Sequence, residues 1–114
     1  MRNRKPLHPL EHHPSFRAAV EAAPALAELS AEVREEDLLS VLVMAVGDLA
    51  EGFVAPPQSR RRARAHQRAW SAVRDLDRKI TAIGRRRLAK AATVRKAQRA
   101  IDRADVMVGA LVSA

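Results

Sequence analysis

Residues 69–83 read AWSAVRDLDRKITAI, and the spacing of the apolar side chains in this stretch decides the fold. These apolar residues follow one another at alternating steps of four and three positions, which places them on one face of an α-helix. Charged residues occupy many of the remaining positions, as on the solvent side of such a helix. The stretch therefore predicts a long amphipathic helix whose buried stripe consists of Ala69, Val73, Leu76, Ile80 and Ile83.

The composition of the whole chain also favours helices. Its 114 residues are enough for one domain with one core. Hydrophobic residues make up 47% of the chain and aromatic residues only 3%, so the apolar content is mainly alanine and aliphatic side chains. Alanine is the best helix former and a poor strand former. We therefore expect an all-α protein.

Helical spacing and helix-breaking residues predict three further helices. The expected helices cover residues 15–30 with a kink at Pro24, 35–53, 59–84 with Ser59 as the N-cap, and 89–112. Four helices with short connections favour an antiparallel up-down-up-down four-helix bundle over residues 15–114. Three prolines in residues 1–14 exclude a helix there, so we expect a flexible basic tail rich in histidine and proline.

The expected helix over residues 35–53 is apolar on most of its sides, which is more than one helix of a small bundle usually buries. The last turns of the helix over 89–112 are apolar all round. Both features predict a second interface and a homo-oligomer. The residues expected at that interface are Val41, Met44, Val106, Met107 and Val112.

Positive charge is concentrated in one part of the chain. Residues 58–89 contain eleven Lys or Arg and two acids, Asp75 and Asp77. Residues 31–57 contain one Arg and six acids, and the whole chain has a formal net charge of +8. A solvated surface needs charge, but it does not need charge sorted by segment. The sorting indicates a polyanionic partner.

An antiparallel bundle explains part of this charge. It places Arg85 to Arg87 near Glu35 to Asp37, where each group also suits its own helix end. The arginines in the first turns of the helix over 59–84 are opposed by the helix dipole, at a cost of ~0.3–1 kcal/mol each. A phosphate backbone, of RNA or of DNA, is the simplest external reason for them. The expected nucleic-acid contacts are Arg60, Arg61, Arg62, Arg64 and Arg68, with Arg17 at the same pole.

Two other interpretations of the arginine cluster stay open. The cluster can be a solvated face without a ligand, or it can dock on an acidic protein surface, which would make the chain a protein-assembly adaptor. Readout of specific bases is not expected, because no zinc-finger, homeodomain or RNA-binding aromatic pattern is present. Trp70 could stack on a base, but it borders the core stripe, and packing is the favoured interpretation.

The sequence offers little for catalysis or metal binding. His8, His12 and His13 lie in the proline-broken segment without an element to fix their geometry, so no metal is expected. The serines lack a His/Asp setting, and no glycine-rich phosphate loop or Glu-x-x-His pair occurs. We expect no cofactor and no enzymatic activity. The basic residues 1–5 precede no apolar signal segment, and no apolar run could span a membrane, which favours the cytoplasm.

Two stretches resemble a known family: AAPALAELS at residues 22–30 and LAEGFVAPPQSRRRARAHQRAWSAVRDLD at residues 49–77. The second contains Ala50-Glu51-Gly52, similar to the "AEG" with which that family ends its second helix. The family comprises the four-helix bundle proteins of 23S rRNA intervening sequences and the accessory variability determinant (Avd) proteins of diversity-generating retroelements. The resemblance covers roughly residues 16–112. It implies a homopentamer without enzymatic activity and, for the Avd branch, binding to nucleic acid and to a reverse transcriptase.

Overall fold

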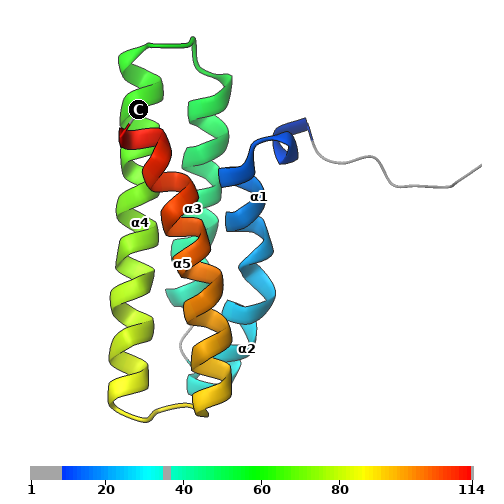
Figure 1. Ribbon diagram of the computed structural model, residues 1–114, viewed down its shortest axis with the longest axis vertical. Coiled ribbons are helices and arrows are strands. Elements are labelled where there is room, and N and C mark those ends of the chain that lie inside the picture. Colours follow the sequence, from blue (N-terminus) through cyan, green and yellow to red (C-terminus); the bar gives the residue numbers. More distant parts are fainter. Residues whose placement is uncertain (1–8, 35–36, 114) are drawn as a thin grey trace, which may run out of the picture.

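The computed structural model describes residues 9–34 and 37–113, and these residues are helical with no strand. The expectation of an all-α protein is confirmed. Residues 1–8, 35, 36 and 114 lie outside the described part (Figure 1). The elements in chain order are a 3-10 helix η1 (Pro9–His12), α1 (Pro14–Glu21), α2 (Ala23–Val33), α3 (Asp37–Val54), α4 (Arg60–Arg85) and α5 (Ala91–Ser113).

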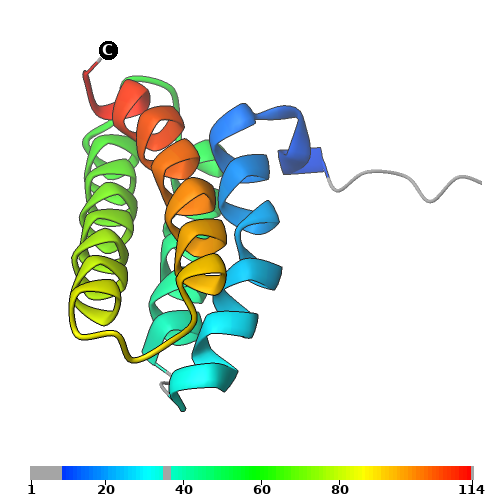
Figure 2. The same ribbon diagram turned by 60° about the horizontal axis from the view of Figure 1, so that its bottom comes forward.

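The expected helix over residues 15–30 consists of two helices, α1 and α2, that follow one another along one side of the molecule (Figure 2). Pro24 lies in the first turn of α2, where a missing backbone N–H costs nothing. The break falls at Ala22, whose N–H still reaches the carbonyls of Ala18 and Ala19 at 3.2 Å. Proline therefore divides this segment but does not displace its second half from the core.

Each long helix contacts its neighbours along the chain and the α1–α2 pair. α4 lies between α3 and α5 and contacts both, and α1 and α2 contact the same two helices from the other side. α3 and α5 therefore lie across the molecule from one another. Figure 1 shows the α3–α4 loop at one end, where it projects beyond the end of α5, and the α4–α5 loop at the opposite end.

The core lies between these helices and is built by the stripes that helical spacing predicts. All five residues of the stripe from Ala69 to Ile83 are buried. Alanines fill the positions where helices come closest, and aliphatic side chains fill the rest. The largest fully buried side chains are Leu26, Leu29, Leu38, Leu49, Leu76, Ile80, Ile101, Val73 and Val108.

The helix ends show how the sequence sets the element boundaries. Ser59 caps α4 as expected, since its hydroxyl accepts the N–H of Arg62 at 3.1 Å. At the other end of α4, the N–H of Leu88 reaches the carbonyl of Ile83 at 3.1 Å, and the N–H of Arg87 reaches that of Gly84 at 3.2 Å. This pair of bonds is a Schellman motif. Arg87 takes the left-handed position, φ 54°, that glycine usually occupies.

Two parts of the chain differ from expectation. The segment expected to form a flexible tail includes η1 and the first residue of α1, and the ring of His13 stacks on Phe53 with centroids 3.7 Å apart. The packing is possible because a 3-10 helix accepts proline at its start. Gly52, expected in a loop, is buried within α3. None of the described helices combines the length and the apolar character needed to cross a membrane.

Candidate nucleic-acid interface

Arg62 closes the end of α3. Its guanidinium donates hydrogen bonds to the carbonyl oxygens of Gly52, Phe53 and Ala55, at 2.8, 2.9 and 2.9 Å. The last carbonyls of a helix have no partner inside the helix, and a cation also suits the negative end of the helix dipole. This expected phosphate contact therefore has a partner inside the chain and is half-buried there.

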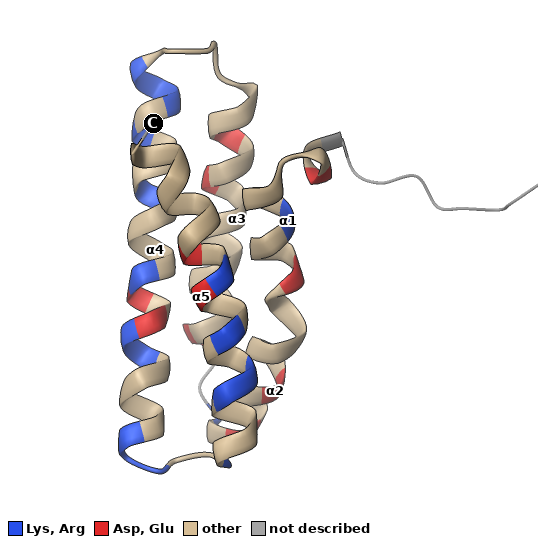
Figure 3. Cartoon of the chain, viewed as in Figure 1, with Lys and Arg blue, Asp and Glu red and all other residues tan. Residues whose placement is uncertain are grey.

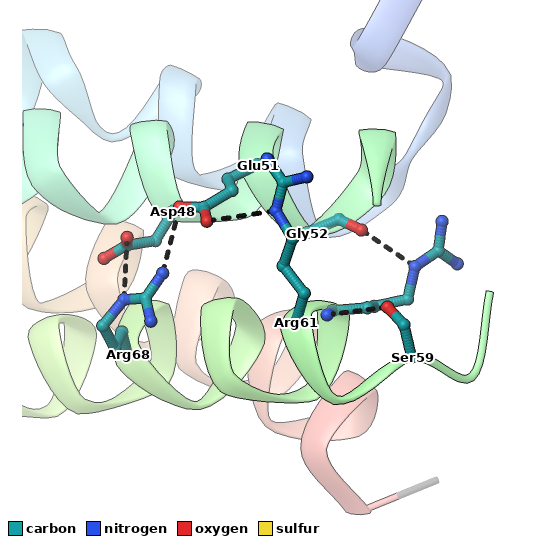
Figure 4. Close-up of polar contacts among 7 residues, drawn as sticks. Asp48, Glu51, Gly52, Ser59, Arg61 and Arg68 are labelled. Carbon is teal, nitrogen blue, oxygen red and sulfur yellow. Dashed lines mark hydrogen bonds and ion pairs between the residues drawn. The ribbon is translucent and has the colours of Figure 1, made fainter. Parts of the chain in front are cut away.

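Arg61 and Arg68 pair with the two acids on the facing turns of α3. The guanidinium of Arg68 donates to Asp48 at 3.2 Å and to Glu51 at 3.0 Å, and Arg61 lies 3.5 Å from Glu51 (Figure 4). The hydrogen bond to Asp48 is the main cause that raises the pKa of Arg68 above its usual value. Both arginines remain exposed, so these ion pairs hold two cations at the surface between α3 and α4.

Arg17 is also engaged within the chain. Its guanidinium donates two hydrogen bonds, at 3.0 and 2.7 Å, to the carbonyl oxygen of Glu11 in η1. The side chain thus ties the 3-10 helix to α1. It remains exposed, so its charge still adds to the positive potential at this side of the molecule.

Arg60 and Arg64 differ from the other four. Both are exposed, and neither forms a hydrogen bond or an ion pair with any residue in the described ranges. They stand in the first two turns of α4, at the projecting end of the molecule, where the helix dipole opposes a cation. The arrangement within the chain therefore explains four of the six arginines and leaves these two unexplained.

The structure adds further arginines on the same side of α4. We call the exposed residues that point away from the core the α4 ridge: Arg60, Arg64, Arg74, Arg78 and Arg85. Figure 3 shows basic residues along α4 from end to end. The ridge covers 25 residue steps, which is about 37 Å along the helix axis. The spacing of four, ten, four and seven residues keeps these side chains within one sector of the helix, and this signal is present in the sequence.

The acids of the ridge's neighbourhood compensate it only weakly. Arg78 lies 3.7 Å from Asp75, and both side chains are well exposed, so the pair contributes little. Asp77 instead accepts a hydrogen bond from Gln98 of α5. At the other pole, Asp37 lies 4.0 Å from Lys79. The expected partners Glu35 and Glu36 lie outside the described residues, so their pairing with Arg85 to Arg87 stays a prediction.

The aromatic side chains are used inside the chain. The indole N–H of Trp70 donates to Asp105 at 2.9 Å, and Arg74 lies over the ring at 5.0 Å from its centroid. Phe16 is buried, and Phe53 is stacked on His13. Trp70 thus packs between α4 and α5, and none of these rings offers two free faces for base stacking.

A buried histidine lies behind the arginine-rich turns of α4. The ring of His66 is only 6% exposed and meets the ring of Phe53 edge-on at 4.9 Å. Gly52 makes room for it, because a Cβ there would lie 2.5 Å from Nε2. Within the described part of the chain Nε2 has no hydrogen-bond partner. Burial, and then the charges of Arg62 and His13, lower the pKa of His66, so the imidazole is neutral near pH 7.

The five residues expected at an oligomer interface occupy two separate places. Val41 and Met44 border a groove between α3 and α4, and the side chain of Met44 is 65% exposed. Val106 is 68% exposed on α5, whereas Met107 and Val112 are half-buried. The structure therefore does not gather these residues into one patch.

Comparisons of the chain with protein-family models, with curated proteins and with solved structures return no match. The resemblance drawn from residues 22–30 and 49–77 thus stays a prediction. Within the described residues, no group of three or more His, Cys, Asp or Glu side chains is placed to hold a metal ion. The candidate site is a surface of arginines on an all-helical protein.

Proposed function

We propose that the chain binds nucleic acid through its phosphate backbone, with the α4 ridge as the contact surface. The observation that carries this proposal is the placement of Arg60 and Arg64. They are exposed, they have no partner among the described residues, and they stand at the end of α4 where cations are disfavoured. A phosphate chain along the ridge would supply the missing counter-charge.

The character of the surface favours backbone contact over readout of bases. The ridge consists of long, exposed guanidinium groups, which bind phosphate oxygens in a bidentate manner. The indole N–H of Trp70 and the ring of Phe53 already have partners within the chain. We therefore expect binding that depends on salt concentration and hardly on sequence.

A pair of matched double variants tests this proposal. Replacing Arg60 and Arg64 with Gln removes two cations without a partner, and replacing Arg61 and Arg68 with Gln removes two ion-paired cations at the same end of the helix. Binding of labelled duplex and single-stranded oligonucleotides is measured by fluorescence anisotropy over a range of salt concentrations. The first variant should lower the slope of log K against log salt by nearly two if each arginine contacts one duplex phosphate.

The control variant should lose less of the slope, because Arg61 and Arg68 are also held by α3. Equal loss in both variants would show that only net charge matters and would refute the assignment to the ridge. Absence of salt-dependent binding to any oligonucleotide would refute the function itself. Circular dichroism should show unchanged helix content in both variants.

We propose in addition that the scaffold is an antiparallel up-down-up-down four-helix bundle, with α1 and α2 together as its first helix. The opposite positions of the α3–α4 and α4–α5 loops support this topology (Figure 1). We propose that the bundle self-associates, because Val43, Met44 and Val106 are large apolar side chains exposed by 65–68%. The resemblance implies five copies.

A further inference from the structure

The chain has two exposed apolar surfaces on opposite sides. The first, which we call the α3 face, consists of Val43, Met44 and Gly47. The second, which we call the α5 end, consists of Val106 and Ala110 on the outer side of α5. α3 and α5 lie across the molecule from one another, so one surface cannot cover the other within a single chain. Two copies can pair them.

Gly47 is the least expected residue on the α3 face. It lies in the middle of an exposed helical stretch, where glycine is less favourable than alanine by roughly 1 kcal/mol. A Cβ built on Gly47 would meet no atom within 4 Å, so nothing in the described chain requires glycine there. A glycine on a helix surface lets another backbone approach closely. The α3 face therefore has the form of a docking site for a helix.

The charges around the two surfaces are complementary. α3 contains Asp37, Asp48 and Glu51 but no Lys or Arg, and Figure 3 shows acids as its only charged residues. On the outer side of α5, exposed arginines precede Val106, and they form no ion pair with any residue that the structure describes: Arg95, Arg99 and Arg103. A helix that suits the α3 face is thus present elsewhere on the same chain.

We propose that the α3 face of one copy receives the α5 end of a second copy. Val43 and Gly47 are four residues apart, as are Val106 and Ala110, so each pair lies on one side of its helix. An antiparallel crossing places Val106 over Gly47, Ala110 beside Val43, and Arg103 next to Glu51. The interface is heterologous, so repeated contacts close into a ring or extend into a filament. This inference rests on the proposed self-association and is independent of nucleic-acid binding.

A complementation experiment tests the pairing without nucleic acid. The α3-face variant carries Val43→Glu and Met44→Glu, and the α5-end variant carries Val106→Glu and Ala110→Glu. All four side chains are exposed, so the fold should survive, as circular dichroism and thermal unfolding would verify. By multi-angle light scattering at about 50 μM, well above a micromolar Kd, the unmodified chain should be oligomeric and each variant monomeric.

Mixing the two variants should produce a dimer. The α3-face variant keeps an intact α5 end, and the α5-end variant keeps an intact α3 face, so one sound interface forms between them. A mixture that stays monomeric would refute the heterologous pairing, as would a monomeric unmodified chain or a variant that still associates. Oligonucleotide binding by the monomeric variants is measured separately, so loss of association and loss of nucleic-acid binding are distinguished.

The variant Gly47→Leu separates helix docking from general apolar adhesion. Leucine is a good helix former, and it enlarges the exposed apolar surface. Adhesion of apolar patches would therefore strengthen with this variant. Close approach of a second helix at Gly47 predicts the reverse, at least a tenfold weaker association in sedimentation or dilution experiments. Equal or tighter association would refute the role of Gly47.

Discussion

Replacing Arg62 with Ala should destabilise the fold far more than replacing Arg60, two positions earlier in the same helix turn. Three backbone carbonyls of the α3 end lose their donor, with bonds that now measure 2.8 to 2.9 Å. A hydrogen bond typically contributes about 1 kcal/mol net, and more when one partner is charged. The site is half-buried, so water can replace part of the loss. We expect Arg62→Ala to lower the free energy of unfolding by about 2–3 kcal/mol.

Urea denaturation followed by circular dichroism measures this difference directly. Arg60→Ala should stay within about 0.5 kcal/mol of the unmodified chain, since its side chain is exposed and without a partner. The two variants remove the same charge, so general electrostatic effects cancel. Oligonucleotide binding should show the opposite order, with the larger loss for Arg60→Ala. If Arg62→Ala were no less stable than Arg60→Ala, the assignment of Arg62 as the cap of α3 would be wrong.

Three further predictions concern stability. The lowered pKa of His66 means that the unfolded chain takes up a proton first as pH falls, so the free energy of unfolding should decrease below about pH 6.5; His66→Gln should reduce this loss in urea titrations at several pH values. Gly52→Ala should destabilise by about 1–3 kcal/mol through its clash with His66, whereas Gly47→Ala in the α5-end variant should stabilise by about 0.5–1 kcal/mol. Arg87→Gly should stabilise by roughly 0.5–1 kcal/mol in thermal unfolding, because glycine adopts the left-handed position without strain. An unchanged pH profile for the His66 variant, equal effects of the two alanine substitutions, or destabilisation by Arg87→Gly would contradict the respective explanation.

The helices could be predicted from the sequence because their signals are local. The stripe from Ala69 to Ile83 is decided by residues three and four positions apart, and the Ser59 cap by a residue three positions away. Each is contained in a few neighbouring letters. The same holds for the α4 ridge, whose helical spacing is visible once the helix is placed.

The roles of the individual arginines could not be predicted in this way. Arg62 reaches carbonyls seven to ten residues earlier, and Arg68 reaches acids 17 and 20 residues earlier. These contacts depend on how α3 and α4 lie side by side and on which way a long side chain turns. Neither is fixed by spacing along the chain. A cluster that reads as one patch therefore separates into side chains that hold the fold and side chains that face solvent.

The start of α5 depends on a residue from the other end of the domain. The carboxylate of Glu32, in the last turn of α2, accepts the N–H of Lys90 at 2.5 Å and the hydroxyl of Thr93 at 2.7 Å. The first of these contacts is the main reason why the pKa of Glu32 lies below its usual value. The two segments are about 60 residues apart, so this cap forms only after the loop between them has closed. The first turn of α5 is therefore a late step in folding, and it reports whether α2 has docked.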